Sequence, residues 1–110
     1  MLNFRLYLAQ RLTALIMAPL VLLHLGVMIY AIQGGLDAAE ILSRTRGSLF
    51  WGSVYSLFVL CAAIHGAIGI RVVVHETLAP GKPLLDWLTA GLVIALTYLG
   101  ARAVYAVVLA

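Results

Sequence analysis

The residues best suited to chemistry lie in an apolar run that ends in charge, between Cys61 and Glu76. His65 is the ligand-capable side chain in this run. At about 100° per residue, Cys61 and Gly69 lie one turn to either side of His65 on the same helical stripe. Both are small, so a flat group such as a haem can lie against the helix there. An ionisable side chain at hydrocarbon depth is a candidate functional group, and this pattern favours His65 as a haem ligand.

A simpler interpretation of the same stripe stays open. His65 would then be a buried polar residue that is hydrogen-bonded to a neighbouring helix, and Gly66 and Gly69 would allow close helix packing. Cys61 is the one cysteine in the chain, which excludes an intrachain disulfide and is typical of a small buried hydrophobic residue.

The composition identifies a membrane protein. Of the 110 residues, 65% are hydrophobic and 10% are charged, which is far from the balance of a soluble domain. The length leaves no room for a separate globular domain of typical size, so other redox or catalytic machinery must come from partner chains. The net charge of +3 is spread along the chain, and no basic cluster suggests nucleic-acid binding.

Three apolar segments are long enough to cross a bilayer, about 12–32, 48–74 and 86–109. They predict an all-α fold: one integral membrane domain over residues 1–110 with three transmembrane helices. Pro19 predicts a kink in the first of them, because proline removes a backbone hydrogen bond.

Several signals predict how these helices are connected. Residues 1–10 have the character of an amphipathic lead-in lying at the interface. Gly34 and Gly35 end the first span, and Asp37 can cap a short surface helix. The turn signal at 79–83 reverses the chain, and Asp86 is a reasonable N-cap for the third helix.

Basic residues indicate the orientation. The positive-inside rule favours a cytoplasmic N-terminus by a margin of one residue. The N-terminal side holds Arg5, Arg11, Arg71 and Lys82, and the other side holds Arg44, Arg46 and Arg102.

Arg11, at the mouth of the first span, is a second candidate. One interpretation is an interfacial anchor whose side chain snorkels to the headgroups. The other is a polar group beside a cofactor. Arg71 follows His65 by six residues, about 9 Å along a helix, so Arg71 at the interface would put His65 well inside the hydrocarbon. Arg11 would stand at the level of Arg71.

The combination His65, Gly69 and Arg71, with Glu76 five residues after the arginine, resembles a known motif. It is similar to the haem-ligating span of the cytochrome b membrane-anchor subunits of succinate dehydrogenase and fumarate reductase. The resemblance in span plan covers nearly the whole chain. It implies that His65 is an axial ligand of a haem b iron, and that Gly69 and Arg71 belong to the haem surroundings.

The start of the first span extends this resemblance. Arg11 followed by Thr13 matches the family pattern of an arginine two residues before a small hydroxyl residue. By position, Arg11 would lie beside the quinone and the haem propionates, and Glu76 near the same pocket. Two positions depart from the family pattern: Tyr7 stands where some members have a quinone-contacting serine, and Gln10 stands where many have histidine.

The function implied is that of an anchor subunit of a succinate:quinone oxidoreductase, not catalytic alone. Its partners would be a flavoprotein subunit, an iron–sulfur subunit and a second membrane anchor that completes a larger helical bundle. It would sit in the cytoplasmic (inner) membrane and use haem b and either ubiquinone or menaquinone. The alternative is a haem-free structural anchor of a fumarate reductase-like complex. A small multidrug transporter fits less well, since only three spans fit and no acidic residue lies inside a span, Asp86 being at the very start of the third.

His24 is the other histidine within a span, and we expect it not to ligate the same haem as His65. Arg11 to His24 is about 20 Å of helix and Arg71 to His65 about 9 Å, so the two imidazoles should differ in depth by about 10 Å. The second ligand should then come from a partner anchor or a second copy of this chain. The roles left open for His24 are a hydrogen bond to another helix and ligation of a separate distal haem.

Overall fold

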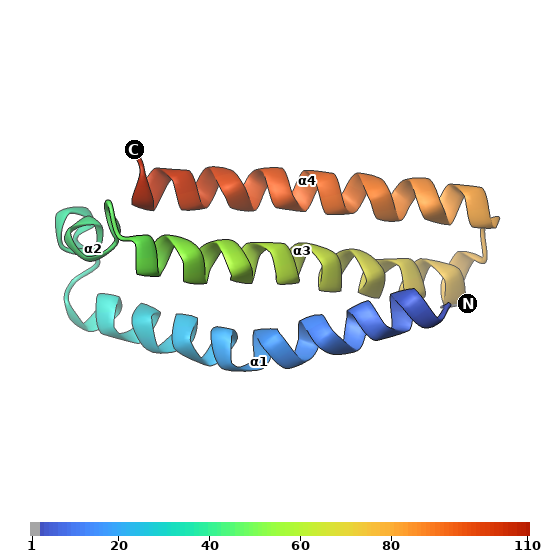
Figure 1. The fold of residues 1–110 in the computed structure, drawn as a ribbon, viewed down its shortest axis with the longest axis horizontal. Coiled ribbons are helices and arrows are strands. Elements are labelled where there is room, and N and C mark those ends of the chain that lie inside the picture. The colour runs from blue at the N-terminus through green and yellow to red at the C-terminus, as the bar shows by residue number, and fades with distance from the viewer. Residues whose placement is uncertain (1–2) are drawn as a thin grey trace.

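The computed structural model describes residues 3–110, which form helices and no strands. The helices are α1 (Phe4–Gln33), α2 (Ala38–Thr45), α3 (Leu49–Leu78) and α4 (Lys82–Val108). The three long helices lie side by side and α2 lies across one end of them (Figure 1). Each long helix is apolar and long enough to cross a bilayer. The predicted all-α membrane fold with three transmembrane helices is confirmed.

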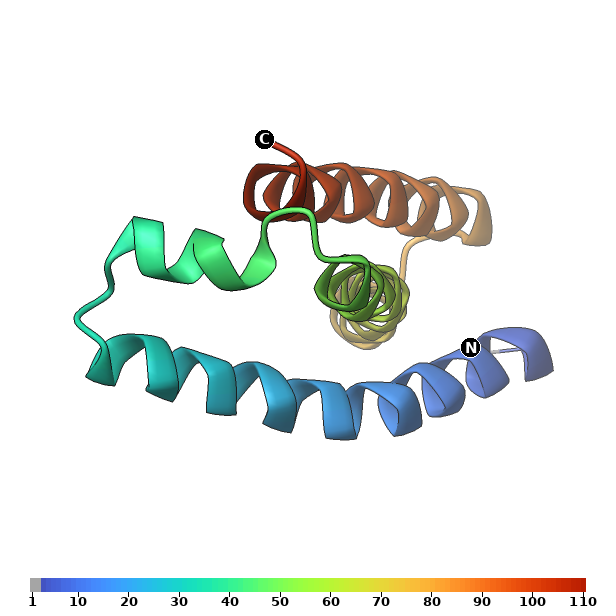
Figure 2. The same cartoon turned by 60° about the vertical axis from the view of Figure 1, so that its left-hand side comes forward.

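Helix α3 is the centre of the bundle. It lies between α1 and α4 in both views (Figures 1 and 2), and it contributes the largest share of the buried side chains. They are Cys61, Ala63, Ala67, Ile68 and Arg71. Most of these residues are small, which allows the neighbouring helices to approach closely. The outer faces of α1 and α4 remain largely exposed and are suited to lipid or to partner helices.

Helix α1 begins earlier than the sequence suggests. The Asn3 side-chain oxygen accepts a hydrogen bond from the Leu6 backbone N–H at 2.8 Å, so the helix starts at Phe4. From Phe4 onward the residues of the expected lead-in form one continuous helix with the first span, and their position at the interface stays a prediction. Met1 and Leu2 lie outside the described residues. Pro19 lies inside α1, which bows along its length (Figure 1).

The connections follow the predicted turn signals. Gly35 has a φ of +91° just after α1, a conformation that suits glycine. The Asp37 carboxylate accepts from the Ala39 N–H at 3.1 Å and caps α2, so the predicted short helix is confirmed. Helix α3 ends at Leu78, and the next residue, Ala79, is left-handed with a φ of 46° and starts the chain reversal.

Helix α2 is attached to the far end of α4. The Thr45 hydroxyl donates to the carbonyl oxygen of Val107 at 2.7 Å. The Gly47 N–H donates to the carbonyl oxygen of Val108, also at 2.7 Å. These carbonyls lie in the last turn of α4, where no helical N–H follows to satisfy them. The crosswise helix therefore serves as part of the C-terminal cap of α4.

The prediction that Asp86 caps the third helix is wrong. Helix α4 starts one turn earlier, at Lys82, with Gly81 as its N-cap. Pro83 stands in the first turn, where proline is tolerated because the first N–H groups of a helix have no intrahelical acceptor. Asp86 is therefore a helical residue, and its carboxylate accepts from Arg71 at 2.9 Å and from Lys82 at 2.8 Å.

Glycines on α3 and α4 allow these two helices to pack closely. A Cβ atom built on Gly100 would lie 2.9 Å from Cγ2 and 3.1 Å from Cβ of Val59. A Cβ atom on Gly52 would lie 3.3 Å from Cγ1 of Val108. Because backbones that approach this closely leave little freedom to slide, the register of α3 against α4 is well defined.

Candidate functional site

His65 is anchored to α1 through one ring nitrogen. Its Nδ1 lies 3.3 Å from the carbonyl oxygen of Gln10 and 3.4 Å from the hydroxyl oxygen of Thr13. The Thr13 hydroxyl donates its own hydrogen to the carbonyl oxygen of Ala9 at 2.7 Å. Both neighbours of Nδ1 therefore act as acceptors, so Nδ1 carries the hydrogen of the neutral imidazole.

The second ring nitrogen, Nε2, keeps its lone pair. It makes no hydrogen bond within residues 3–110, and the side chain of His65 is half-buried. Metal-bound histidines commonly donate one ring N–H to a backbone carbonyl, which fixes the tautomer and the orientation of the ring. The contacts with Gln10 and Thr13 give His65 this arrangement.

The small-residue stripe around His65 faces α1. Cys61 is buried, with 4% exposure. A Cβ atom on Gly69 would lie 3.7 Å from the side-chain nitrogen of Gln10, so the Gln10 amide covers the surface expected to accept a haem. The amide oxygen of Gln10 is buried and has no hydrogen-bond partner in residues 3–110. Such an unpaired atom marks polar surface next to Gly69 that an additional group can satisfy.

Arg71 points to a different neighbour. Its side chain is 6% exposed, and its guanidinium donates to the Asp86 carboxylate at 2.9 Å and to the Thr89 hydroxyl at 3.1 Å, both on α4. Six helical residues turn the chain by about 240° net, so Arg71 and His65 lie on different faces of α3. Both hydrogen bonds of Arg71 thus link α3 to α4, and its place beside a cofactor stays a prediction.

The sequence reasoning did not identify these two partners of Arg71. A signal was available, since an arginine inside an apolar helix needs a nearby anion. Asp86 is the first acidic residue after the turn that follows α3.

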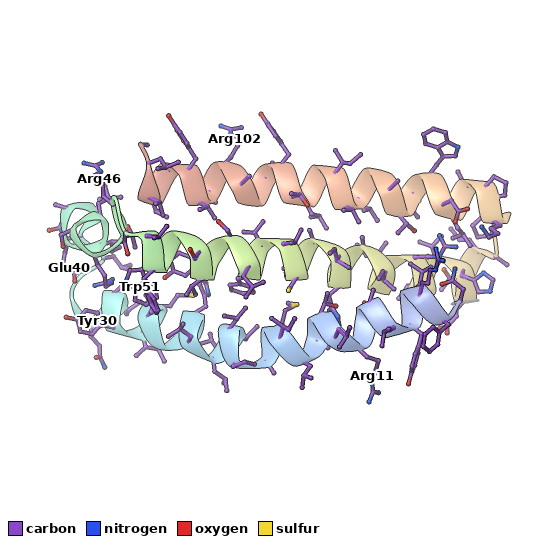
Figure 3. The ribbon with its side chains drawn as sticks, in the orientation of Figure 1. Arg11, Tyr30, Glu40, Arg46, Trp51 and Arg102 are labelled. Atoms are coloured by element: carbon purple, nitrogen blue, oxygen red, sulfur yellow. The ribbon has the colours of Figure 1, made fainter. Side chains whose placement is uncertain are left out.

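Arg11 lies beside Tyr7, and neither residue makes a polar contact with Glu76 in residues 3–110. Arg11 is exposed and projects from α1 away from α3 and α4 (Figure 3), with its guanidinium carbon 6.0 Å from the centre of the Tyr7 ring. Glu76 is exposed near the end of α3 and forms no ion pair within residues 3–110. A pocket that contains all three therefore requires surfaces from other subunits.

His24 lies at a different depth from His65. Its ring packs edge-on against Phe58 and Tyr55 of α3, with ring centres 5.3 and 6.1 Å apart. Phe58 precedes His65 by seven residues, about 10 Å along α3. The structure thus agrees with the spacing argument that the two histidines occupy different levels. Within residues 3–110, His24 makes no hydrogen bond to another helix.

No three His, Cys, Asp or Glu side chains gather into a bare metal-ion site in the described part of the chain. A haem needs less from the protein, because its porphyrin supplies four ligands and an axial histidine one more. The fold and site define a multi-pass helical membrane protein that presents one oriented histidine on its central helix, against the first half of α1.

The model of the succinate dehydrogenase/fumarate reductase transmembrane subunit family matches residues 2–101. The chain belongs to this family. No curated protein and no solved structure matches it.

Proposed function

We propose that this chain is a cytochrome b membrane anchor of a succinate:quinone oxidoreductase, with His65 as an axial ligand of a b-type haem. The observation that supports the proposal most is the anchoring of His65 Nδ1 to α1, which leaves Nε2 available for iron. The haem would supply a one-electron carrier beside the path to quinone. Its second axial ligand would come from a second membrane anchor or a second copy of this chain, since His24 lies at another depth.

The chain's own residues would orient and accommodate the haem. The Gln10 carbonyl and the Thr13 hydroxyl hold the imidazole. Gly69 offers a flat surface once the flexible Gln10 side chain moves aside. Arg71 fixes α3 against α4 and so sets the depth of the ligand, and its buried Nε, which has no partner in the described residues, can serve a further group.

The quinone site would form at the end of the bundle where α1 begins and α3 ends. Arg11 would donate hydrogen bonds to the negative charge that develops on a quinone oxygen, and Glu76 would provide a route for protons. Tyr7 packs beside Arg11 and would line the same pocket. Because these side chains lie on outer surfaces, the iron–sulfur subunit and the second anchor would complete the pocket. The quinone would be ubiquinone or menaquinone.

Electrons would reach this site from a flavoprotein subunit through the iron–sulfur subunit. Such subunits must dock on one side of the membrane, and the distribution of basic residues supports a cytoplasmic N-terminus in an inner membrane. The chain would thus form the membrane part of a respiratory enzyme and would not be catalytic alone.

The test is a reduced-minus-oxidised absorption spectrum of the complex purified with its partners. His65→Ala should remove or convert the low-spin haem signal, and Gly69→Leu should weaken it through bulk. His24→Ala is the matched control and should leave the spectrum of that haem intact. Unchanged haem content in His65→Ala would refute the ligand assignment. A wild-type complex that is intact and haem-free would identify the chain as a structural anchor instead.

A further inference from the structure

Two apolar grooves meet at one arginine at the end of the bundle where α2 lies. The larger, of about 630 Å³, runs between α1, α3 and α4 beneath α2. The smaller, of about 450 Å³, follows the outer face of α1. Val27 and Arg44 line both grooves. Among residues 3–110, Arg44 is the one charged residue that lines either groove, so both apolar grooves lead to the same guanidinium.

Helix α1 forms the ridge that separates the grooves. His24 and Met28 face the larger groove, and Gly26 and Tyr30 face the smaller one. At about 100° per residue these pairs lie about 160° apart around the helix, with Val27 on the arc between them. A molecule bound in both grooves would straddle α1 below Arg44.

The guanidinium of Arg44 has unused hydrogen-bonding capacity. One nitrogen, Nη1, donates to the Glu40 carboxylate at 2.9 Å, and the group lies over the Tyr30 ring at 5.0 Å. Its Nε and Nη2 atoms are buried and have no partner within residues 3–110. Buried donors without acceptors are costly, so an acceptor from outside these residues is expected. The side chain keeps 21% exposure, which lets this edge turn toward a ligand.

The position of Arg44 is that of a headgroup contact. Helix α2 links the ends of two transmembrane helices and therefore lies at a membrane surface. Tyr30 and Trp51 lie at the same end of the bundle (Figure 3), as expected of aromatic residues at an interface. The forked donors of an arginine match the oxygens of a phosphate group.

We propose that this region binds one diacyl glycerophospholipid, with its phosphate on Arg44 and one acyl chain in each groove. The phosphate would satisfy the unpaired Nε and Nη2 donors. Two chains leaving one headgroup match two grooves leaving one guanidinium, whereas an amphiphile with one chain would fill one groove. The proposal is independent of haem and quinone binding.

Native mass spectrometry of the delipidated complex tests the headgroup contact. The complex should retain added palmitoyl-oleoyl phosphatidylglycerol better than dioleoylglycerol, which lacks the phosphate. Arg44→Leu should lower this retention about ten-fold, the loss expected for one charge-assisted contact. Arg46→Leu is the matched control, because Arg46 is exposed and points away from the bundle (Figure 3), and it should retain the lipid. Equal loss in both variants, or no preference for the phosphate, would overturn the proposal.

A second pair of variants tests the grooves without touching the charge. In the described residues, nothing lies within 4 Å of a Cβ atom built on Gly26 or on Gly91, so both helices tolerate a side chain there. Gly26→Leu should fill the smaller groove and reduce retention of the two-chain lipid to that of lysophosphatidylglycerol. Gly91→Leu, on α4 and outside both grooves, should have no effect.

Two outcomes would overturn the two-groove assignment. The one-chain lipid could bind the wild-type complex as well as the two-chain lipid does. Alternatively, His24→Ala could remove a haem signal, which would mean that the larger groove holds a haem rather than an acyl chain.

Discussion

Replacing Gly100 with alanine tests how closely α4 packs on α3, the helix that carries His65. The added Cβ atom would lie 3.1 Å from Cβ of Val59, well inside the ordinary carbon contact distance of about 3.5 to 4.0 Å. Rotating the Val59 side chain cannot move its own Cβ atom. The two helices must therefore separate by a few tenths of an ångström, and contacts along the interface weaken.

The expected magnitude follows from two opposing terms. Overpacking of this kind costs about 1 to 3 kcal/mol. Alanine is also the better helix former and gains up to about 1 kcal/mol over glycine. Gly91→Ala is the matched control, since it makes the same change where no described atom beyond the adjoining helix backbone and chain neighbours lies within 4 Å of the new Cβ. The difference between the two variants cancels the propensity term and should be about 1 to 3 kcal/mol.

The assay is the free energy of unfolding in mixed micelles with an increasing fraction of dodecyl sulfate, measured on the chain within its purified complex. The double variant Gly100→Ala/Val59→Ala should recover most of the loss, because the clashing γ-methyl groups are gone and the interface can relax. Equal stability of Gly100→Ala and Gly91→Ala, within about 0.5 kcal/mol, would refute the close approach of the helices.

Three further changes test other parts of the molecule. Arg11→Leu should reduce quinone reduction more than electron transfer to an artificial soluble acceptor. The control Arg102→Leu, which changes another exposed arginine beside a tyrosine, should leave the ratio of these two activities unchanged. Equal loss of both activities in Arg11→Leu would indicate defective assembly instead. Asp86→Asn leaves Arg71 buried without its carboxylate and should lower the dodecyl sulfate midpoint, so an unchanged midpoint would contradict the importance of this pair. Asp37→Ala removes the cap of α2 and should cost that helix about 1 kcal/mol, seen as faster amide hydrogen exchange in α2; unchanged exchange would mean that its contacts with α4 suffice.

The three transmembrane helices could be predicted because long apolar segments in a bilayer must satisfy their backbone groups internally. The candidate ligand was predictable too, since His65 is a rare polar residue within such a segment. Its acceptor on α1 was not, because a backbone carbonyl such as that of Gln10 has no signature in the side-chain sequence. Helical periodicity identifies the face of a residue, and it does not identify what packs against that face.

Asp86 shows a second reason for error. Two adjacent signals, Gly81 followed by Pro83 and Asp86 itself, each fit the start of a helix. The helix starts at the first of these signals, and Asp86, one turn later, pairs with Arg71 of α3 instead of capping the helix. The roles of Arg11 and Glu76 stay predictions for a related reason, since both side chains lie on outer surfaces that partner chains would cover.

The hydrogen bonds from α2 to the end of α4 link the order of synthesis to the order of assembly. Thr45 is synthesised 62 residues before Val107. In the folded chain the Thr45 hydroxyl donates to the carbonyl oxygen of Val107. Elements near the N-terminus generally form first during translation. The surface connection must therefore wait, with its hydroxyl and the Gly47 amide exposed to water, until the last turn of α4 arrives. The final residues of α4 thus complete the hydrogen bonds of the α2 connection, which is synthesised much earlier. Insertion of the third span is therefore the step that completes the end of the bundle where α2 lies.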